Sequence, residues 1–199
     1  MTDRKKQILQ TAIEIIATEG YGNLTMRALA RASDMKLGAL QYHFPTSDDM
    51  LRAMVAHISD TYVSSFEALR GKYSAPGVRD IVLFIFDDEA GQQLMGDRLW
   101  PQLWAMQQIE PLVSDLVDDI FAQSITALEQ ELAKMGIVSP RGEALCLMAL
   151  LEGSTIFTGK GRRWARNKKL LRATLLQIVD DRYGELEVLP VTLKQVNQR

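Results

Sequence analysis

The stretch Gly20–Pro45, GYGNLTMRALARASDMKLGALQYHFP, decides the fold. Its spacing predicts two short helices joined by a tight turn. Thr25 is the expected N-cap of a helix over 26–32, because a threonine hydroxyl can accept a hydrogen bond from a free backbone N–H of the first turn. A second short helix is expected over 36–43, because the residue before Pro45 disfavours helical backbone.

The residues before this stretch predict a first helix over 4–19. Leu9, Ile13 and Ile16 recur on one face of it, and Gly20 then favours its end. Three helices, of which the last two are short and tightly joined, make a helix-turn-helix. The last helix of that motif enters the major groove of DNA and therefore needs small or polar side chains at its N-terminal end. The sequence thus predicts a helix-turn-helix domain over residues 1–46.

The remaining residues, 47–199, also have helical spacing, so the fold class is all-α with a second, C-terminal helical domain. Thr46 or Ser47 is the expected N-cap of a long connecting helix over 47–71. Later helices are expected over 77–90, 94–107, 111–135, 140–159 and 165–183. Pro101 is expected to kink or split the second of these. For the tail from Gly184 onward, a loosely packed extension and disorder remain the alternatives.

The composition, 47% hydrophobic and 24% charged, fits a soluble globular protein. The chain has neither an apolar run long enough to span a bilayer nor a recognisable signal peptide, so we expect a cytoplasmic protein. Its one cysteine, Cys146, cannot form an internal disulfide and is expected in the core. Two histidines and one cysteine, without metal-ligand spacing or a phosphate-binding loop, predict no enzyme, no metal and no cofactor.

The helix-turn-helix residues resemble those of the TetR family of transcriptional regulators. Residues 20–30, GYGNLTMRALA, are similar to the family's turn and Thr-capped helix, and residues 37–45, LGALQYHFP, to its recognition helix and aromatic-His-Phe-Pro exit. The resemblance covers roughly the first quarter of the chain, and its order and spacing are specific. It implies a homodimer that binds double-stranded operator DNA through this motif and a small-molecule effector through its C-terminal helices.

The resemblance also implies which residues contact DNA. Thr25 and Arg27 take positions that contact phosphates, and Tyr42 and His43 take those where the recognition helix meets the backbone. Lys36 through Ala39 form the base-reading end, with Leu37 equally interpretable as a core residue. The full predicted set is Arg4, Lys5, Lys6, Thr25, Arg27, Lys36, Leu37, Gly38, Ala39, Gln41, Tyr42, His43 and Ser47.

Two positions depart from the family pattern. The family usually has tyrosine where this chain has Gln41, which could instead read an adenine edge or bind a phosphate. It usually has lysine at the position of Ser47, and here Asp48 and Asp49 follow. The loss of one phosphate-binding lysine reduces the counterions released on binding by about one, which weakens DNA binding without abolishing it.

The middle helices are expected to enclose the effector pocket, with aromatic, soft and polar side chains as its lining. The predicted ligand-binding residues are Trp100, Leu103, Trp104, Met106, Gln107, Phe121, Ile125, Thr155 and Phe157. Aromatic residues at helical spacing are also typical of a plain core. The effector class stays open between an apolar aromatic compound, an anion, and a polyamine-like cation attracted by tryptophan faces and by Asp97, Asp118 and Asp119.

The last two long helices, over 140–159 and 165–183, are expected to form the dimer interface. The expected contact residues are Leu145, Met148, Ala149, Leu171, Leu175 and Ile178. The segment between Lys160 and Arg172 carries seven basic residues. It is either a solvated loop or a site for an anionic partner.

The sequence therefore predicts a ligand-responsive regulator, most simply a repressor of a near-palindromic operator that the effector releases. Activation is a variant of this function that depends on where the operator lies. The alternative is an interaction protein of the same fold that has lost specific DNA binding, which Ser47, Asp48 and Asp49 motivate.

Overall fold

The computed structural model describes residues 2–72, 76–92 and 94–184, and every regular element in these ranges is a helix, which confirms the all-α prediction. The helices are α1 (Asp3–Glu19), α2 (Met26–Ala32), α3 (Leu37–His43), α4 (Ser47–Lys72), α5 (Val78–Asp87), α6 (Glu89–Gln92), α7 (Gly96–Met106), α8 (Pro111–Lys134), α9 (Pro140–Thr158) and α10 (Lys168–Tyr183), with short 3-10 turns at Tyr21–Asn23 and Ala165–Asn167. The predicted tail from residue 185 lies outside the described residues.

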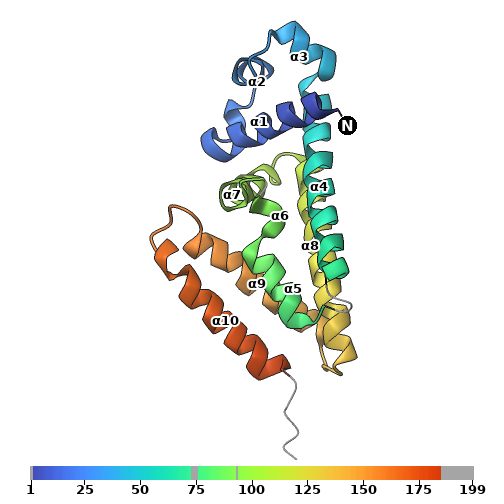
Figure 1. Cartoon of the computed structure of the whole chain (residues 1–199), viewed down its shortest axis with the longest axis vertical. Coiled ribbons are helices and arrows are strands. Elements are labelled where there is room, and N and C mark those ends of the chain that lie inside the picture. The colour runs from blue at the N-terminus through green and yellow to red at the C-terminus, as the bar shows by residue number, and fades with distance from the viewer. Residues whose placement is uncertain (1, 73–75, 93, 185–199) are drawn as a thin grey trace, which may run out of the picture.

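The helices are arranged in an elongated molecule with α1, α2 and α3 at one end (Figure 1). The long helices α4 and α8 pack side by side and run away from that end. Helix α7 packs against both α1 and α8, while α9 packs along α8. The helix-turn-helix therefore rests on α4 and α7, and the far half of the molecule is built from α5, α8, α9 and α10.

Two hydrophobic clusters hold this arrangement together. The first joins α1, α2 and α3 to α4, α7 and α8, with Ile13, Leu29 and Leu40 fully buried beside Leu103. The second lies between the C-terminal part of α4 and helices α5, α8, α9 and α10, and it includes Phe66 of α4 and Val82 of α5. Because the first cluster crosses between the helix-turn-helix and the rest of the chain, the two parts share one continuous core rather than touching at a polar surface.

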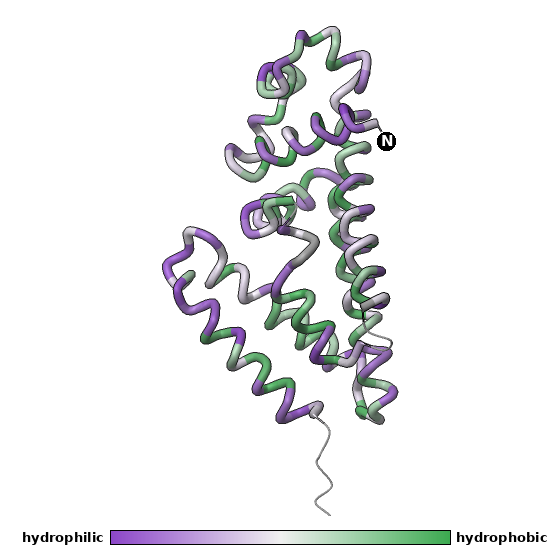
Figure 2. The backbone as a smooth tube through the Cα atoms, in the orientation of Figure 1, coloured by the Kyte–Doolittle hydropathy of each residue, from purple (hydrophilic) through white to green (hydrophobic). Residues whose placement is uncertain are grey.

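The distribution of hydropathy follows these clusters (Figure 2). Helices α5 and α9 carry long apolar stretches, whereas the connection between α9 and α10 is hydrophilic. None of the described helices combines the length and the apolar character that crossing a lipid bilayer requires.

The structure corrects one predicted helix. The expected helix over 77–90 ends at Asp87, because Asp88 adopts a left-handed backbone conformation with φ 45°. Aspartate tolerates this conformation better than most residues, since its short polar side chain can bond locally.

Pro101 neither splits nor ends α7, which runs unbroken from Gly96 to Met106.

Candidate nucleic-acid interface and cavity

Helix α2 is fixed by a cap at its start, and both α2 and α3 are held by burial of one side. The Thr25 hydroxyl accepts a 3.1 Å hydrogen bond from the backbone N–H of Ala28, as the N-cap prediction requires. Leu29 and Leu40 are fully buried, and Phe44 at the exit of α3 is buried as well. One side of each short helix is therefore buried in the core, and the other side of α3 is accessible to a binding partner.

The outward side of α3 is composed of small and polar residues. Gln41, Ala39 and Lys36 are exposed, and the Tyr42 side chain is 86% exposed. Leu37 and His43 are half-buried. A Cβ added at Gly38 would meet no atom within 4 Å, so internal packing does not require glycine there. This surface can approach another molecule closely along the whole length of α3.

The predicted basic arm of α1 is partly engaged within the chain. The Arg4 guanidinium donates to the backbone carbonyl of Ser33 at 3.1 Å, which ties α1 to the turn after α2. The Lys5 ammonium lies 5.4 Å from the centre of the Phe44 ring. Lys6 is exposed. The arm therefore lies on the helix-turn-helix, with its positive charge close to α3.

The start of α4 explains the two acidic residues that depart from the expected pattern. Thr46 is the N-cap: its hydroxyl accepts from the Asp49 backbone N–H at 3.0 Å, and the Asp49 carboxylate accepts from the Thr46 backbone N–H at 3.1 Å. This reciprocal pair is a capping box. The Asp48 carboxylate accepts from the Arg52 guanidinium at 2.9 Å. Both acids thus stabilise the first turn of α4, and Ser47 is exposed beside them.

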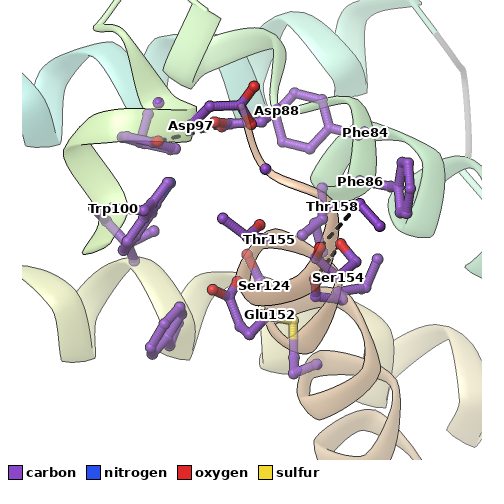
Figure 3. A pocket seen from close by; sticks show the side chains of 18 of the residues that line it. Phe84, Phe86, Asp88, Asp97, Trp100, Ser124, Glu152, Ser154, Thr155 and Thr158 are labelled. Atoms are coloured by element: carbon purple, nitrogen blue, oxygen red, sulfur yellow. Dashed lines mark hydrogen bonds between the residues drawn. The ribbon is translucent and has the colours of Figure 1, made fainter. Parts of the chain in front are cut away.

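A cavity lies between α4, α5, α7, α8 and α9 (Figure 3). Its lining is mostly aromatic and apolar, with a few carboxylates and hydroxyls. The lining residues include Tyr62, Phe66, Phe84, Phe86, Asp88, Asp97, Trp100, Ile120, Phe121, Ser124, Met148, Glu152, Ser154, Thr155, Thr158 and Lys168. A mostly apolar wall that carries a small number of polar groups is typical of a small-molecule site.

Aromatic rings form one wall of this cavity. The Trp100 and Phe121 rings stack with centroids 5.6 Å apart and planes 6° from parallel. The Tyr62 ring meets Trp100 edge to face, also at 5.6 Å. Helices α4, α7 and α8 each contribute one of these rings, so the wall depends on the relative placement of all three helices.

The Asp88 carboxylate is held at one side of the cavity. Its Oδ1 accepts hydrogen bonds from the Gly91 backbone N–H at 3.0 Å and from the Tyr62 hydroxyl at 3.2 Å. A Cβ on Gly91 or Gly96 would lie 1.8 Å or 2.1 Å from Asp88 Oδ2, so both positions need glycine for this carboxylate to fit. Burial raises the pKa of Asp88 and, together with Asp88, that of Tyr62.

The Glu152 carboxylate points into the cavity from α9 (Figure 3). Burial, and to a smaller degree the nearby Asp88, raises the pKa of Glu152 from 4.5 to about 7. Lys168 also lines the cavity, but its ammonium lies 3.7 Å from the Asp97 carboxylate. The lining therefore holds three carboxylates and a single, already paired lysine.

Comparison with known protein sequences finds matches to the helix-turn-helix segment of the chain. Residues 8–54 match the family described as bacterial regulatory proteins, tetR family. The segment with the helix-turn-helix is thus similar to the DNA-binding region of that family. A helix-turn-helix-type transcriptional regulator of Xanthobacter autotrophicus is 43% identical over 51 residues, which is 26% of this chain and 25% of that protein. A second such regulator, from Bacillus subtilis, is 24% identical over 76 residues, or 38% of this chain and 26% of that protein. The matches thus span about a quarter of these curated relatives.

Solved structures share the fold over almost the whole chain. A transcriptional regulator from Rhodococcus sp. Rha1 has a TM-score of 0.73 at 17% identity and covers 93% of this chain and all of its own. A protein from Saccharomonospora viridis, assigned as a transcriptional regulator and solved in complex with choline, has a TM-score of 0.71 at 19% identity, with 90% of this chain and 97% of its own covered. A TetR transcriptional regulator from Legionella pneumophila has a TM-score of 0.68 at 17% identity, with 92% and 98% covered. These matched proteins are regulators rather than enzymes.

Three of the nine predicted ligand-binding residues line the cavity: Trp100, Phe121 and Thr155. The other six lie outside the lining of this cavity. Leu103 and Met106 are buried in the first cluster, against which Trp104 packs, and Ile125 packs on the second. Gln107 follows α7 outside the lining, and Phe157 is 54% exposed and packs edge to face on Trp164. The residues of one apolar helix point in several directions, and spacing alone does not tell a cavity from a core.

Two cavity carboxylates were not predicted from the sequence. Glu152 had a visible signal, since it is the one charged residue between Glu143 and Lys160 in an otherwise apolar helix. Asp88 had none, because its position depends on a backbone turn that separates α5 from α6. Of the acids that were predicted, Asp97 lines the cavity, whereas Asp118 and Asp119 are outside its lining.

The predicted interface residues also divide into two groups. Leu145, Ala149 and Ile178 are exposed on α9 and α10, together with Leu150, Ile156 and Leu170. Met148 and Leu175 are buried within the chain, and Leu171 is partly buried against the second cluster.

Cys146 is exposed rather than buried, because it follows Leu145 on the outward side of α9.

Proposed function

We propose that this chain is a DNA-binding transcriptional regulator whose affinity for its operator depends on a small-molecule effector. The observation that carries the proposal is the outward side of α3, where small and polar residues stand free on a helix-turn-helix of the TetR family. Arg27 and the basic arm at Lys5 and Lys6 lie on the same unit and supply phosphate contacts, which position the protein on DNA. In this arrangement Gly38 and Gln41 face the edges of the bases. The protein acts in the cytoplasm, where its operator is.

The proposed assembly is a homodimer through α9 and α10. Exposed leucine and isoleucine side chains on these two helices support it, because an apolar surface of this kind costs free energy when it faces water. A two-fold axis through α9 and α10 would place the two α3 helices apart on one side of the dimer. Such a dimer meets successive major grooves, about 34 to 36 Å apart, and reads a near-palindromic site.

The proposed mode of action is repression that the effector relieves. The cavity shares Trp100 and α7 with the core on which the helix-turn-helix rests, so a ligand that changes the position of α7 changes the position of α1. A ligand shifts the population only by its difference in affinity for the two arrangements. The choline complex of the Saccharomonospora viridis relative supports a small-molecule ligand in a fold of this kind.

The second candidate is an interaction protein that keeps the fold without specific DNA binding. Ser47, in place of a phosphate-binding lysine, favours it. The neighbouring acids do not, because Asp49 belongs to the capping box and Asp48 pairs with Arg52. Their presence is therefore explained by the stability of α4.

Fluorescence anisotropy of the purified protein with labelled DNA from around its own gene tests the proposal. Scrambled DNA of the same composition is the control, and both are titrated at a low and a high salt concentration. The proposal predicts a marked preference for the native DNA, with affinity that falls as salt rises. Equal, weak binding to both DNAs across the flanking region favours the second candidate.

A further inference from the structure

We propose that the cavity binds an organic cation, an amine or a quaternary ammonium ion, between the carboxylates of Glu152 and Asp88 and against the Trp100 ring. The inference rests on the proposed function in one respect, namely that this cavity is the effector site. It adds the charge and the chemical class of the effector. Figure 3 shows the space that such a ligand would fill, with Asp88 on one side, Glu152 on another and Trp100 between them.

Glu152 is the first observation. Within the described ranges its carboxylate has neither a hydrogen bond nor an ion pair, although it lies on an apolar stretch of α9 and lines the cavity. A carboxylate removed from water without a partner is costly, and the protein responds by favouring its protonated form. The pKa of about 7 is consistent with this. A bound cation would supply the missing partner.

The second observation is that the position of the Asp88 carboxylate depends on several special features of the backbone. It takes a left-handed backbone conformation, and Gly91 and Gly96 leave the room that its carboxylate occupies. Its two hydrogen bonds, from Gly91 and Tyr62, both reach Oδ1. They fix the direction of the carboxylate without neutralising its charge.

The aromatic wall is the third observation. A cation over the face of a tryptophan or tyrosine ring is attracted by the ring's electrons, most strongly when water is excluded. Trp100 and Tyr62 line the cavity with Phe121, so the two carboxylates and the rings converge on the same space. The lining itself contains one contact of this kind, since the Lys168 ammonium lies 5.8 Å from the centre of the Phe86 ring.

The charge balance argues against an anion. Glu152, Asp88 and Asp97 all line the cavity, and Lys168 is the one basic residue among the lining residues. Its ammonium already pairs with Asp97. An anionic ligand would therefore meet the negative charges of Asp88 and Glu152, and a neutral apolar ligand would leave the Glu152 carboxylate without a partner.

Isothermal titration calorimetry of the full chain with three probes of similar shape tests the inference. Phenyltrimethylammonium is the cation, tert-butylbenzene is its neutral isostere, and benzenesulfonate is the anion. The wild type should bind the cation at least about tenfold more tightly than either of the others. Glu152→Gln keeps the shape of the side chain and should weaken cation binding about tenfold. Asp119→Asn removes the same charge from an exposed position on α8 and should leave the affinity unchanged.

Equal affinity for the cation and its neutral isostere, preference for the anion, or no detectable cation binding would each overturn the inference. So would an equal loss in Glu152→Gln and Asp119→Asn, since that would indicate a general effect of charge. The same samples are assayed for operator binding without any probe. Specific operator binding without cation binding would refute the cation alone and leave the proposed function standing, whereas cation binding without operator binding would refute the regulator and keep the site.

Discussion

The hydroxyl of Tyr21 donates a 2.6 Å hydrogen bond to Oε1 of Glu110 and thereby joins the helix-turn-helix to the segment that leads into α8. Tyr21 follows α1 directly, and Glu110 lies between α7 and α8. Burial, with the Glu110 contact as a second cause, raises the pKa of Tyr21 to about 12. The bond therefore persists at any physiological pH. It spans the two parts of the molecule beside the packing of α7 on α1.

Tyr21→Phe should weaken this link. Because the bond is a single, part-buried one, we expect a loss of about 1 kcal/mol in the free energy of unfolding, measured by urea denaturation. The change in operator affinity caused by a cavity ligand should also shrink, while the affinity without ligand stays nearly the same. Glu110→Gln retains an acceptor oxygen and is the control that should preserve most of the coupling. Full coupling in Tyr21→Phe would show that the helix packing alone transmits the signal.

Glu152 makes the stability of the protein depend on pH. Its pKa is 4.5 in an unfolded chain and about 7 in the folded one, so between these values the folded state holds a proton that the unfolded state lacks. The free energy of unfolding due to this group therefore falls as pH rises from about 4.5 to about 7 and is level above that. Glu152→Gln should gain on the order of 1 to 3 kcal/mol at pH 8 and almost nothing at pH 4. Thermal melts at the two pH values check this, and an equal change at both would contradict it.

The close approach of Gly91 to Asp88 predicts an unusual cost for a small substitution. The Cβ of Gly91→Ala would lie 1.8 Å from Asp88 Oδ2, so the carboxylate must turn away and give up its bonds to Tyr62 and to residue 91. We expect a loss of about 1 to 3 kcal/mol in urea unfolding, together with weaker binding of a cation in the cavity.

Gly71→Ala is the matched control for this substitution. A Cβ there meets nothing within 4 Å, and the residue is exposed near the end of α4. Since alanine favours helix over glycine, it should be neutral or stabilising by up to about 1 kcal/mol. Similar losses of unfolding free energy in both variants would mean that any glycine substitution near a helix end is destabilising, whatever happens to Asp88.

Ser47→Lys should restore a phosphate contact that the chain lacks. Because the new charge stands at the exposed start of α4, beside α3, it should raise the affinity for native and scrambled DNA alike without changing the preference between them. The slope of log affinity against log salt should steepen by about one for each subunit bound. Ser64→Lys adds the same charge farther along α4 and should change neither quantity. An altered preference for the native DNA would show that position 47 also influences base reading.

The helix-turn-helix could be predicted from the sequence because its signals are local. Thr25 caps α2 by its own hydroxyl, Leu29 and Leu40 define the buried sides, and Pro45 follows the end of α3, so a few residues decide each boundary. The long helices were predicted for the same reason. Pro101 did not break α7, although it is the sixth of eleven residues and lacks the N–H that would bond to the carbonyl of Asp97.

The cavity could be predicted only in part, because its residues meet through tertiary packing. Trp100 and Leu103 lie one turn apart on α7 and both belong to the first cluster, yet only Trp100 also lines the cavity. Their residue types do not distinguish these positions. The position of the Asp88 carboxylate depends on a left-handed backbone turn and on the space left by Gly91 and Gly96. No pattern of residue types predicts that combination.

The proposed two-fold arrangement of α3 on DNA is tested most directly by nuclease footprinting of the protein on DNA from around its own gene. A two-fold dimer should give one protected region with two symmetric half-sites, their centres about 34 to 36 Å apart along the duplex. Protection should be lost when Gln41 and Lys36 are both replaced by alanine. Protection without two-fold symmetry, or protection that survives both substitutions, would contradict it.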